Sequence, residues 1–263
     1  MQLPKDTLDS NTSKTIQFES ACHKVLNQSI ESKGIGTLKE KTIHAVLKNF
    51  YAPDVSHQEQ RIEGFVADIF NNGEIIEIQT RNFNTMRHKL ETFLPLYNVT
   101  IVYPIASTKW LSWIDEETGE ITSRRKSPKH GSIYTIIPEL YKIKFFLGHP
   151  NLHFILTFMD IEEYRLLNGW NHTKKKGSTR HDGIPTKLID EIYLEKPQDF
   201  ICFLPEQLPK LFTTKDFQKV TKISQSYATT GLHILHHMGI IERVGKQGRA
   251  YLYQIKNNDM EAF

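Results

Sequence analysis

The stretch that decides the fold is Gly64-Phe-Val-Ala-Asp68-Ile-Phe-Asn-Asn72-Gly73-Glu-Ile-Ile-Glu77-Ile-Gln79-Thr80. Two runs rich in Ile, Val and Phe flank Asn72-Gly73, the dipeptide most typical of a two-residue β-hairpin turn. With these residues as the turn, the register puts Asp68 directly opposite Glu77, and alternation of side chains puts Gln79 on the same face. Like charges directly opposite each other destabilise a sheet. The pair therefore indicates a site that holds a divalent cation.

Composition and charge are those of an ordinary soluble protein. The 263 residues are 39% hydrophobic and 24% charged, enough for one large domain or two smaller ones. No apolar run reaches membrane-spanning length, and the N-terminal residues lack the basic-then-apolar plan of a signal peptide. Cys22 and Cys202 are far apart and in no metal-ligand spacing, which supports neither a disulfide framework nor a zinc site. We expect a cytoplasmic protein.

Helical and strand patterns alternate after a flexible polar arm expected over residues 1–15. This alternation predicts an α/β domain with a mixed sheet over residues 16–202. Thr37 and Glu40 have the spacing of a helix-starting capping box. The predicted elements are helices over 15–29 and 37–50, the hairpin, a helix over 85–94, a strand over 99–103 ended by Pro104, a second hairpin over 110–123, a helix over 138–147, a strand over 153–159 and a polar loop over 174–183.

The C-terminal segment, residues 203–257, differs in charge from the rest. It carries eight Lys or Arg against three Asp or Glu, a local charge of +5, whereas the whole chain carries +3. Helical patterns begin near Phe212, with Thr213 or Thr214 as the N-cap, and near Ser224, and two short strands around a Gly-rich turn follow. A basic module on a near-neutral body indicates a polyanionic partner.

The order of Glu40 on a helix, Asp68 and Glu77 on a hairpin and then a basic helix resembles the PD-(D/E)XK nuclease superfamily over about residues 37–103. The resemblance implies a restriction endonuclease-like fold, in which Asp68 and Glu77 bind Mg²⁺ or Mn²⁺ and Glu40 is an accessory acid. The chemistry agrees, because Mg²⁺ is normally held by one or two carboxylates, with water and substrate phosphate completing its coordination.

Two other acids near the hairpin are poorer candidates. Asp54 directly follows Pro53 at the end of a predicted helix, where Pro-Asp is a common turn sequence. Glu63 is five residues from Asp68 on the same strand and so points to the other face. Register therefore selects Asp68.

Gln79 occupies the position at which the superfamily carries a catalytic Lys. Gln cannot supply a positive charge, and the basic residues that could supply it from the next helix are Lys89, Arg87 and Arg81. Some restriction endonucleases resemble this chain in carrying Gln there, and relocated basic residues are familiar in the superfamily. An active nuclease, with Gln79 and Lys89 among its catalytic residues, and a catalytically inactive relative both remain open.

Residues 212–255 resemble the winged helix-turn-helix. The resemblance implies that the helix from Ser224 to His237 enters the major groove of DNA while the wing meets phosphates. The residues that it would place on DNA are Ser224, Gln225, Tyr227, Arg243, Lys246 and Arg249. Winged helices also serve as protein-interaction modules, so this alternative stays open.

A compact basic cluster directly follows the second predicted hairpin. Its basic side chains are Arg124, Arg125, Lys126 and Lys129. Such a segment is typical of those that follow a phosphate backbone, and we expect it to contact DNA. A second cluster, Lys174-Lys175-Lys176 with Arg180, is more simply a solvated loop.

Together these patterns predict a restriction endonuclease-like α/β domain joined to a small α+β winged-helix domain. The expected function is metal-dependent hydrolysis of phosphodiester bonds in DNA. The alternatives are a catalytically inactive DNA-binding or regulatory protein on a nuclease scaffold, and a protein-interaction subunit of a larger complex. DNA is the expected partner, a second copy of the chain is a further candidate, and no membrane partner is expected.

Overall fold

The computed structural model describes residues 5–31, 42–115, 117–170 and 176–256. The chain forms two compact units, each built from separate stretches of sequence. The first comprises Met1–Gln79, Val102–Ser132 and Leu156–Ile192, and the second comprises Thr80–Ile101, Ile133–Ile155 and Tyr193–Phe263. Among the described residues, no helix is long and apolar enough to cross a membrane.

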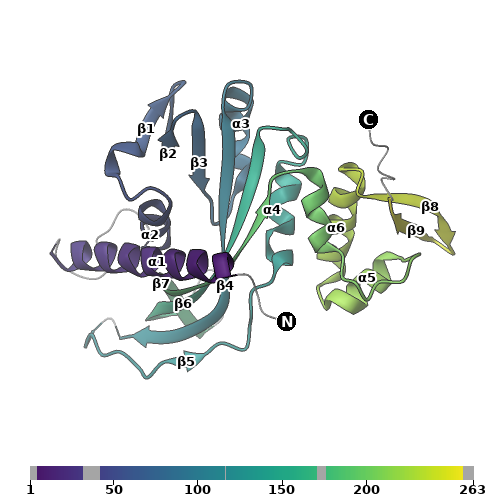
Figure 1. Cartoon of the computed structure of the whole chain (residues 1–263). Coiled ribbons are helices and arrows are strands. Elements are labelled where there is room, and N and C mark those ends of the chain that lie inside the picture. Colours follow the sequence, from purple (N-terminus) through teal and green to yellow (C-terminus); the bar gives the residue numbers. More distant parts are fainter. Residues whose placement is uncertain (1–4, 32–41, 116, 171–175, 257–263) are drawn as a thin grey trace. The chain divides into compact units, whose positions relative to one another are not determined.

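The architecture is mixed α/β, as the sequence predicts (Figure 1). Within the described residues a seven-stranded mixed sheet has the order β1-β2-β3-β4-β6-β7, and β5 pairs with β4. Neighbours β1, β2 and β3 are antiparallel. The strands are β1 (Gln58–Ile62), β2 (Phe65–Asn71), β3 (Glu74–Ile78), β4 (Asn98–Ile114), β5 (Arg125–Lys126), β6 (Leu152–Trp170) and β7 (Lys176–Leu194).

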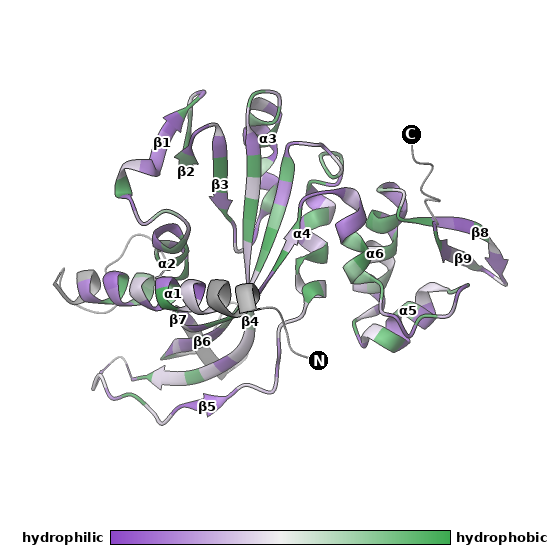
Figure 2. Cartoon of the chain, in the orientation of Figure 1, coloured by the Kyte–Doolittle hydropathy of each residue, from purple (hydrophilic) through white to green (hydrophobic). Residues whose placement is uncertain are grey.

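Among the described residues of the first unit, the α-helices are α1 (Lys5–Glu31) and α2 (Thr42–Tyr51). Figure 2 shows green and purple alternating along α1 and α2, as expected of helices with one apolar face. Phe18 of α1 packs edge-on against Phe50 of α2. The apolar positions of α2 that the sequence predicts are buried: Ile43, Val46, Leu47 and Phe50. The predicted start of this helix, with Thr37 and Glu40, lies outside the described residues.

The sheet of the first unit curves round α2, because this helix contacts both edge strands. Lys48 Nζ lies 2.6 Å from Glu59 Oε1 on β1, and the Thr42 hydroxyl donates a hydrogen bond to Asp182 on β7. Since β1 and β7 are the two ends of the strand order, α2 lies on the concave face of the sheet. Polar groups on that face are held close to α2.

The hairpin at Asn72-Gly73 forms as predicted. Both turn residues have positive φ, 48° and 84°, as a two-residue hairpin turn of this kind requires. The pairs Asn71–Glu74, Phe70–Ile75 and Ile69–Ile76 follow the expected register. The predicted hairpin and its register are therefore confirmed as far as the third pair.

Strand β1 is not predicted, because residues 58–61 are all polar and show no alternation of apolar and polar side chains. Glu63 and Gly64, both with positive φ, form a second tight turn that leads from β1 into β2. β4 runs through Pro104, so the prediction that the strand ends there is wrong. A proline lacks only its own N–H, and its fixed φ suits extended backbone.

Two predictions between residues 133 and 183 also need correction. The helix predicted over 138–147 is shorter in the structure: α4 covers Ile137–Lys142. It directly follows a 3₁₀ helix, η3 (Ile133–Ile136). The polar loop predicted over 174–183 is wrong from Lys176 onward, where β7 begins; residues 171–175 lie outside the described part of the chain. Tertiary pairing with the long strand β6 overrides the polar local sequence.

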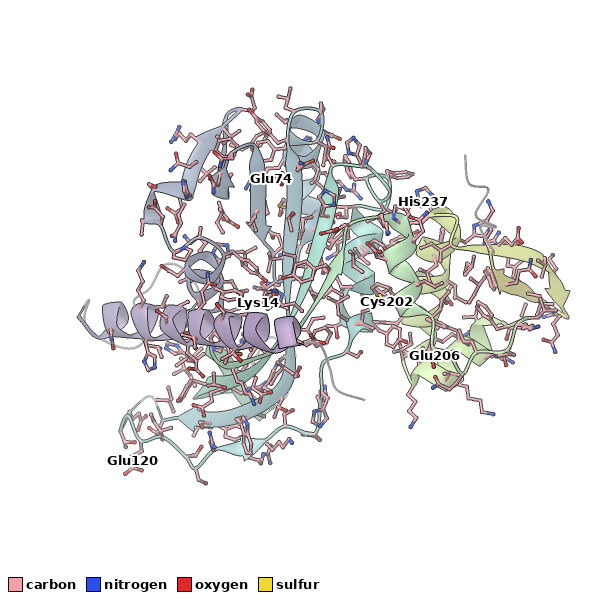
Figure 3. All side chains as sticks on the ribbon, viewed as in Figure 1. Lys14, Glu74, Glu120, Cys202, Glu206 and His237 are labelled. Carbon is pink, nitrogen blue, oxygen red and sulfur yellow. The ribbon has the colours of Figure 1, made fainter. Side chains whose placement is uncertain are left out.

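Helix α1 begins at Lys5, so residues 5–15 do not form the predicted flexible arm. Lys14, labelled in Figure 3, lies with its Nζ 2.8 Å from Glu191 Oε2 on β7. The buried Cys22 thiol donates to the carbonyl oxygen of Pro185, also on β7, and burial raises its pKa to about 12. These partners are far away in the sequence, so the local polar pattern could not reveal them.

The second unit joins the C-terminal segment to helices from earlier in the chain. Tyr134 packs edge-on against Phe217 and against Phe203. The predicted domain boundary between residues 202 and 203 therefore falls inside this unit. Besides η3 and α4, its helices and hairpin strands are η2 (Phe83–Met86), α3 (Arg87–Phe93), η4 (Pro197–Phe203), α5 (Thr214–Thr221), α6 (Gln225–His237), β8 (Ile241–Gln247) and β9 (Ala250–Ile255).

The C-terminal elements follow the predicted order of two helices and an antiparallel hairpin. Thr213 is the N-cap of α5 and forms a capping box with Asp216, and Ser224 caps α6 by accepting a hydrogen bond from the Tyr227 N–H at 3.3 Å. β8 and β9 pair antiparallel. Much of β8 is hydrophilic (Figure 2), which leaves it suited to a solvated or polyanionic environment.

Candidate functional site

Asp68 lies near the end of the ladder between β2 and β3. The last paired residues there are Ile69 and Ile76. Beyond them, the N–H of Ile78 donates to Asp68 Oδ2 at 2.8 Å. The Asp68 side chain thus reaches across to β3 and holds the two strands together where the regular ladder stops.

Extended by one residue beyond the Ile69–Ile76 pair, the register puts Glu77 opposite Asp68. Immediately after it, the N–H of Gln79 donates to the carbonyl oxygen of Val102 on β4 at 2.9 Å. The chain just beyond β3 is thus bonded to β4, the neighbour of β3 on the side away from β2. Glu77 is completely buried, and a Glu side chain is almost never fully buried unless its charge is compensated. Its burial marks it as a residue with a specific role.

His44 of α2 approaches Asp68 from the concave face. Its Nε2 lies 3.1 Å from Asp68 Oδ2, and both side chains keep some exposure to solvent, 24% and 18%. An imidazole N–H that donates to this oxygen orients the carboxylate. Asp68 is therefore fixed from two sides, by a backbone N–H and by His44.

Lys48 lies one helical turn beyond His44 and is buried. Its Nζ pairs with Glu59 Oε1 at 2.6 Å, and the Glu59 side chain is 65% exposed. Gln58 and Gln60 pair with Ile69 and Ala67, the two neighbours of Asp68 in β2. Glu59 therefore occupies the place on β1 that faces Asp68, with a positive φ of 50° that distorts the strand there.

The resulting arrangement is a row of three acids on adjacent strands, Glu59, Asp68 and Glu77, beneath two basic side chains of α2. His44 and Lys48 are four residues apart, so they project from the same face of the helix. None of His44, Lys48 and Glu59 is given a role by the sequence patterns. The sequence signal that could have identified His44 and Lys48 is their spacing of four residues, next to the buried apolar positions of α2.

The oxygen donors at this row suit a hard divalent cation. Among the described residues, no group of three or more His, Cys, Asp or Glu side chains is arranged to hold a metal ion, and Glu40, the predicted third acid, lies outside them. Mg²⁺ needs only one or two carboxylates, because waters and substrate oxygens complete its shell. The chemistry of Asp68 and Glu77 therefore fits Mg²⁺ or Mn²⁺.

Of the two rejected acids, Asp54 lies where the sequence predicts, whereas the prediction that Glu63 lies on the same strand as Asp68 is wrong, because β2 begins only at Phe65. Asp54 is exposed and accepts the Ser56 N–H at 2.9 Å, at the start of the 3₁₀ helix η1 (Val55–His57). This backbone hydrogen bond holds the pKa of Asp54 below its ordinary value. Glu63 lies in the tight turn before β2. Both have positions explained by local backbone geometry.

The basic residues proposed to replace the missing lysine belong to the second unit. Lys89 lies in α3, and Arg87 donates through Nε to the carbonyl oxygen of Lys142 at 2.7 Å. Arg81 is exposed. In the described part of the first unit, Lys48 lies beside the row of acids through its pair with Glu59.

Register divides the predicted basic cluster between two faces of the ribbon formed by β4 and β5. Trp110 pairs with Lys126, whereas Leu111 pairs with Arg125. Arg124 lies over the Trp110 ring at 4.6 Å and pairs with Glu162 on the same face as Lys126. Lys129 is exposed beyond β5.

The predicted DNA-contacting residues of the C-terminal segment lie at the start of α6 and on the hairpin. Gln225 and Tyr227 are exposed in the first turn of α6, whose N-cap is Ser224. Arg243 lies 4.0 Å from the centre of the Tyr251 ring and Lys246 lies 5.4 Å from it. Arg249 is exposed in the turn between β8 and β9.

Comparisons with known proteins give one family and one relative. A family model described as "Domain of unknown function (DUF8091)" matches residues 41–195. A protein of Treponema pallidum (strain Nichols), described as an uncharacterized protein, is 28% identical over 230 residues, which cover 84% of this chain and 87% of the relative. No solved structure matches the chain. The segment that the family model matches includes α2, Asp68 and Glu77.

Proposed function

The chain belongs to the family described as "Domain of unknown function (DUF8091)", and we propose that it is a divalent-metal-dependent DNA endonuclease. The observation that carries the proposal is the position of Asp68 and the buried Glu77, on neighbouring strands under α2, each one residue beyond the Ile69–Ile76 pair. Placing two carboxylates together costs free energy unless a cation compensates them. The proposal includes the finer fold assignment, a restriction endonuclease-like core and a winged helix.

In this proposal Asp68 and Glu77 hold Mg²⁺ or Mn²⁺. The cation supplies charge stabilisation for the phosphoryl oxygens and a nucleophilic water. His44 keeps Asp68 in one orientation through the 3.1 Å contact, and Gln79 orients water or a phosphate oxygen by hydrogen bonding. Lys48 contributes the positive charge that Gln79 lacks, and Glu59 holds its ammonium group in place.

The C-terminal segment serves as the DNA-binding part in this proposal. Its local charge of +5 favours a polyanion, and exposed Gln225 and Tyr227 stand at the start of a helix of suitable length. Arg243, Lys246 and Arg249 on the hairpin would add phosphate contacts whose strength falls with salt.

Plasmid nicking tests the proposal. We expect supercoiled plasmid or branched DNA to be cleaved by the wild-type chain in Mg²⁺ or Mn²⁺ and to survive in EDTA. A double variant, Asp68→Asn with Glu77→Gln, preserves side-chain shape and should leave the DNA intact. Equal behaviour of the wild type and the double variant would overturn the catalytic proposal.

A catalytically inactive DNA-binding protein is the second candidate, and Gln79 at the expected lysine position is the observation that favours it. Absence of cleavage, together with duplex DNA binding that weakens steeply with salt, would support this candidate. Absence of both cleavage and binding would instead favour a protein-interaction subunit.

A further inference from the structure

A second charged group, around Glu163 of β6, lies in the first unit where β4, β6 and β7 are neighbours. The Glu163 side chain is only 2% exposed. Lys109 Nζ of β4 lies 3.0 Å from its Oε2, and Arg165 Nη2 lies 2.6 Å from its Oε1. Arg180 Nε of β7 lies 3.7 Å from Oε2. One buried carboxylate thus gathers three cations from three strands.

The group keeps a net charge of +2. Burial alone would raise the pKa of Glu163, but hydrogen bonds and charges from Lys109 and Arg165 outweigh it and hold the pKa below its ordinary value. The carboxylate is therefore ionised at neutral pH. The side chains of Lys109, Arg165 and Arg180 remain 31%, 35% and 47% exposed. Glu163 fixes the cations in place without neutralising them.

Contacts of α2 put this group on the same face as Asp68. A Cβ on Gly183 of β7 would lie 2.8 Å from the Arg180 guanidinium and 3.4 Å from the Ile43 side chain. The residue after Ile43 is His44, which holds Asp68. The cation group and Asp68 therefore both lie beside the first turn of α2.

Arg125 adds to the positive charge on this face. It pairs with Leu111 in the β4–β5 register, and Leu111 shares a face of β4 with Lys109 because side chains alternate. The guanidinium of Arg125 lies 5.1 Å from the centre of the Trp113 ring. Stacking of this kind restrains an Arg side chain while leaving its N–H groups able to bind phosphate.

We propose that Lys109, Arg165 and Arg180, organised by Glu163, bind phosphates of the DNA backbone beside the carboxylate pair. Three preorganised cations around a single buried anion provide strong donors for a further anion, and guanidinium groups match phosphate oxygens well. The inference rests on the proposed function for its choice of DNA as the ligand. It requires no cleavage.

Binding of a short fluorescein-labelled duplex, measured by anisotropy in EDTA at several KCl concentrations, tests this site. Arg180→Ala removes the most exposed cation of the three and the one farthest from Glu163. We expect its affinity for DNA to fall about fivefold near 150 mM salt, with the slope of log K against log salt reduced by about one. Lys187→Ala, an exposed Lys on the same strand, should leave both quantities unchanged.

Glu163→Gln provides a second readout with the opposite sign. Removing the central anion raises the net charge of the group from +2 to +3, so DNA should bind more tightly, up to about fivefold. A purely structural ion pair would show only a lower melting temperature in this variant, without tighter binding.

The inference fails if Arg180→Ala binds DNA with the affinity and salt slope of the wild type. It also fails if Arg180→Ala loses binding to phosphatidylserine vesicles while DNA binding stays unchanged, since the anionic ligand would then be a lipid surface. EDTA prevents metal-dependent cleavage, so the binding assay does not depend on nuclease activity. If the wild type binds DNA through these cations but cleaves no DNA in Mg²⁺ or Mn²⁺, the proposed function fails and the phosphate-binding site stands.

Discussion

Glu77→Gln should lower the rate of DNA cleavage by on the order of a thousandfold, about 4 kcal/mol of transition-state stabilisation. The substitution keeps the shape of the buried side chain and removes only its negative charge. The loss in rate should therefore reflect the cation site and leave the fold intact. Initial nicking rates in Mg²⁺ and in Mn²⁺, with circular dichroism as a check of folding, measure this effect.

Glu74→Gln is the matched control. Glu74 (Figure 3) lies on the same strand, at the turn end, and is exposed. Three residues from Glu77, it points to the other face of β3. Its substitution should change the nicking rate by less than about twofold, because surface charges away from a site have small effects. Equal losses in Glu74→Gln and Glu77→Gln would mean that the carboxylate of Glu77 has no specific role in cleavage.

Phe217→Ala should destabilise the second unit by about 3–5 kcal/mol. Phe217 of α5 is completely buried, and its ring packs edge-on against Tyr134 with centroids 6.0 Å apart. Ile137 and Leu140 of α4 line one apolar pocket together with Phe217. The loss is a large part of the total stability of an ordinary domain. Urea denaturation followed by circular dichroism measures it.

Phe145→Ala is the control for this change, since Phe145 is 78% exposed and should cost less than about 0.5 kcal/mol. Hydrogen exchange gives the more specific readout. If α4 and α5 share one core, amides of α4 should exchange faster in Phe217→Ala. Unchanged exchange in α4, or a cost below about 1 kcal/mol, would contradict the inclusion of the C-terminal helices in that core.

The sequence predicted the hairpin because its information is local. Asn72-Gly73 specifies the turn, the turn specifies the register, and the register brings Asp68 to Glu77. The same reasoning predicted an N-cap at Thr213 or Thr214, and Thr213 is the cap, where its side chain satisfies a backbone N–H.

The sequence did not predict features that depend on distant contacts. β1 is polar and is stabilised by pairing with β2, and its residue Glu59 is recognisable only once Lys48 of α2 lies beside it. The long strand β7 pairs through tertiary contacts that no short window contains. The compact unit that holds the C-terminal helices also includes Tyr134, because Tyr134 and Phe217, far apart in the sequence, pack against each other.

Asp68 and Glu77 were selected from register, and their role as metal ligands stays a prediction. His44 and Lys48 could be added only from the orientation of α2 over the sheet. Glu40 lies outside the described residues, and its role as an accessory acid stays a prediction. Lys89 belongs to the second unit, and its catalytic role likewise stays a prediction.

Titration of the metal-free chain with Mn²⁺ tests the central claim most directly, because it requires neither DNA nor turnover. Isothermal calorimetry should find one Mn²⁺ site per chain in the wild type and in Asp54→Asn, whose carboxylate only caps a turn. The same site should be weakened at least about tenfold in Asp68→Asn. Equal Mn²⁺ affinity in Asp68→Asn and the wild type would contradict a cation site built from Asp68 and Glu77.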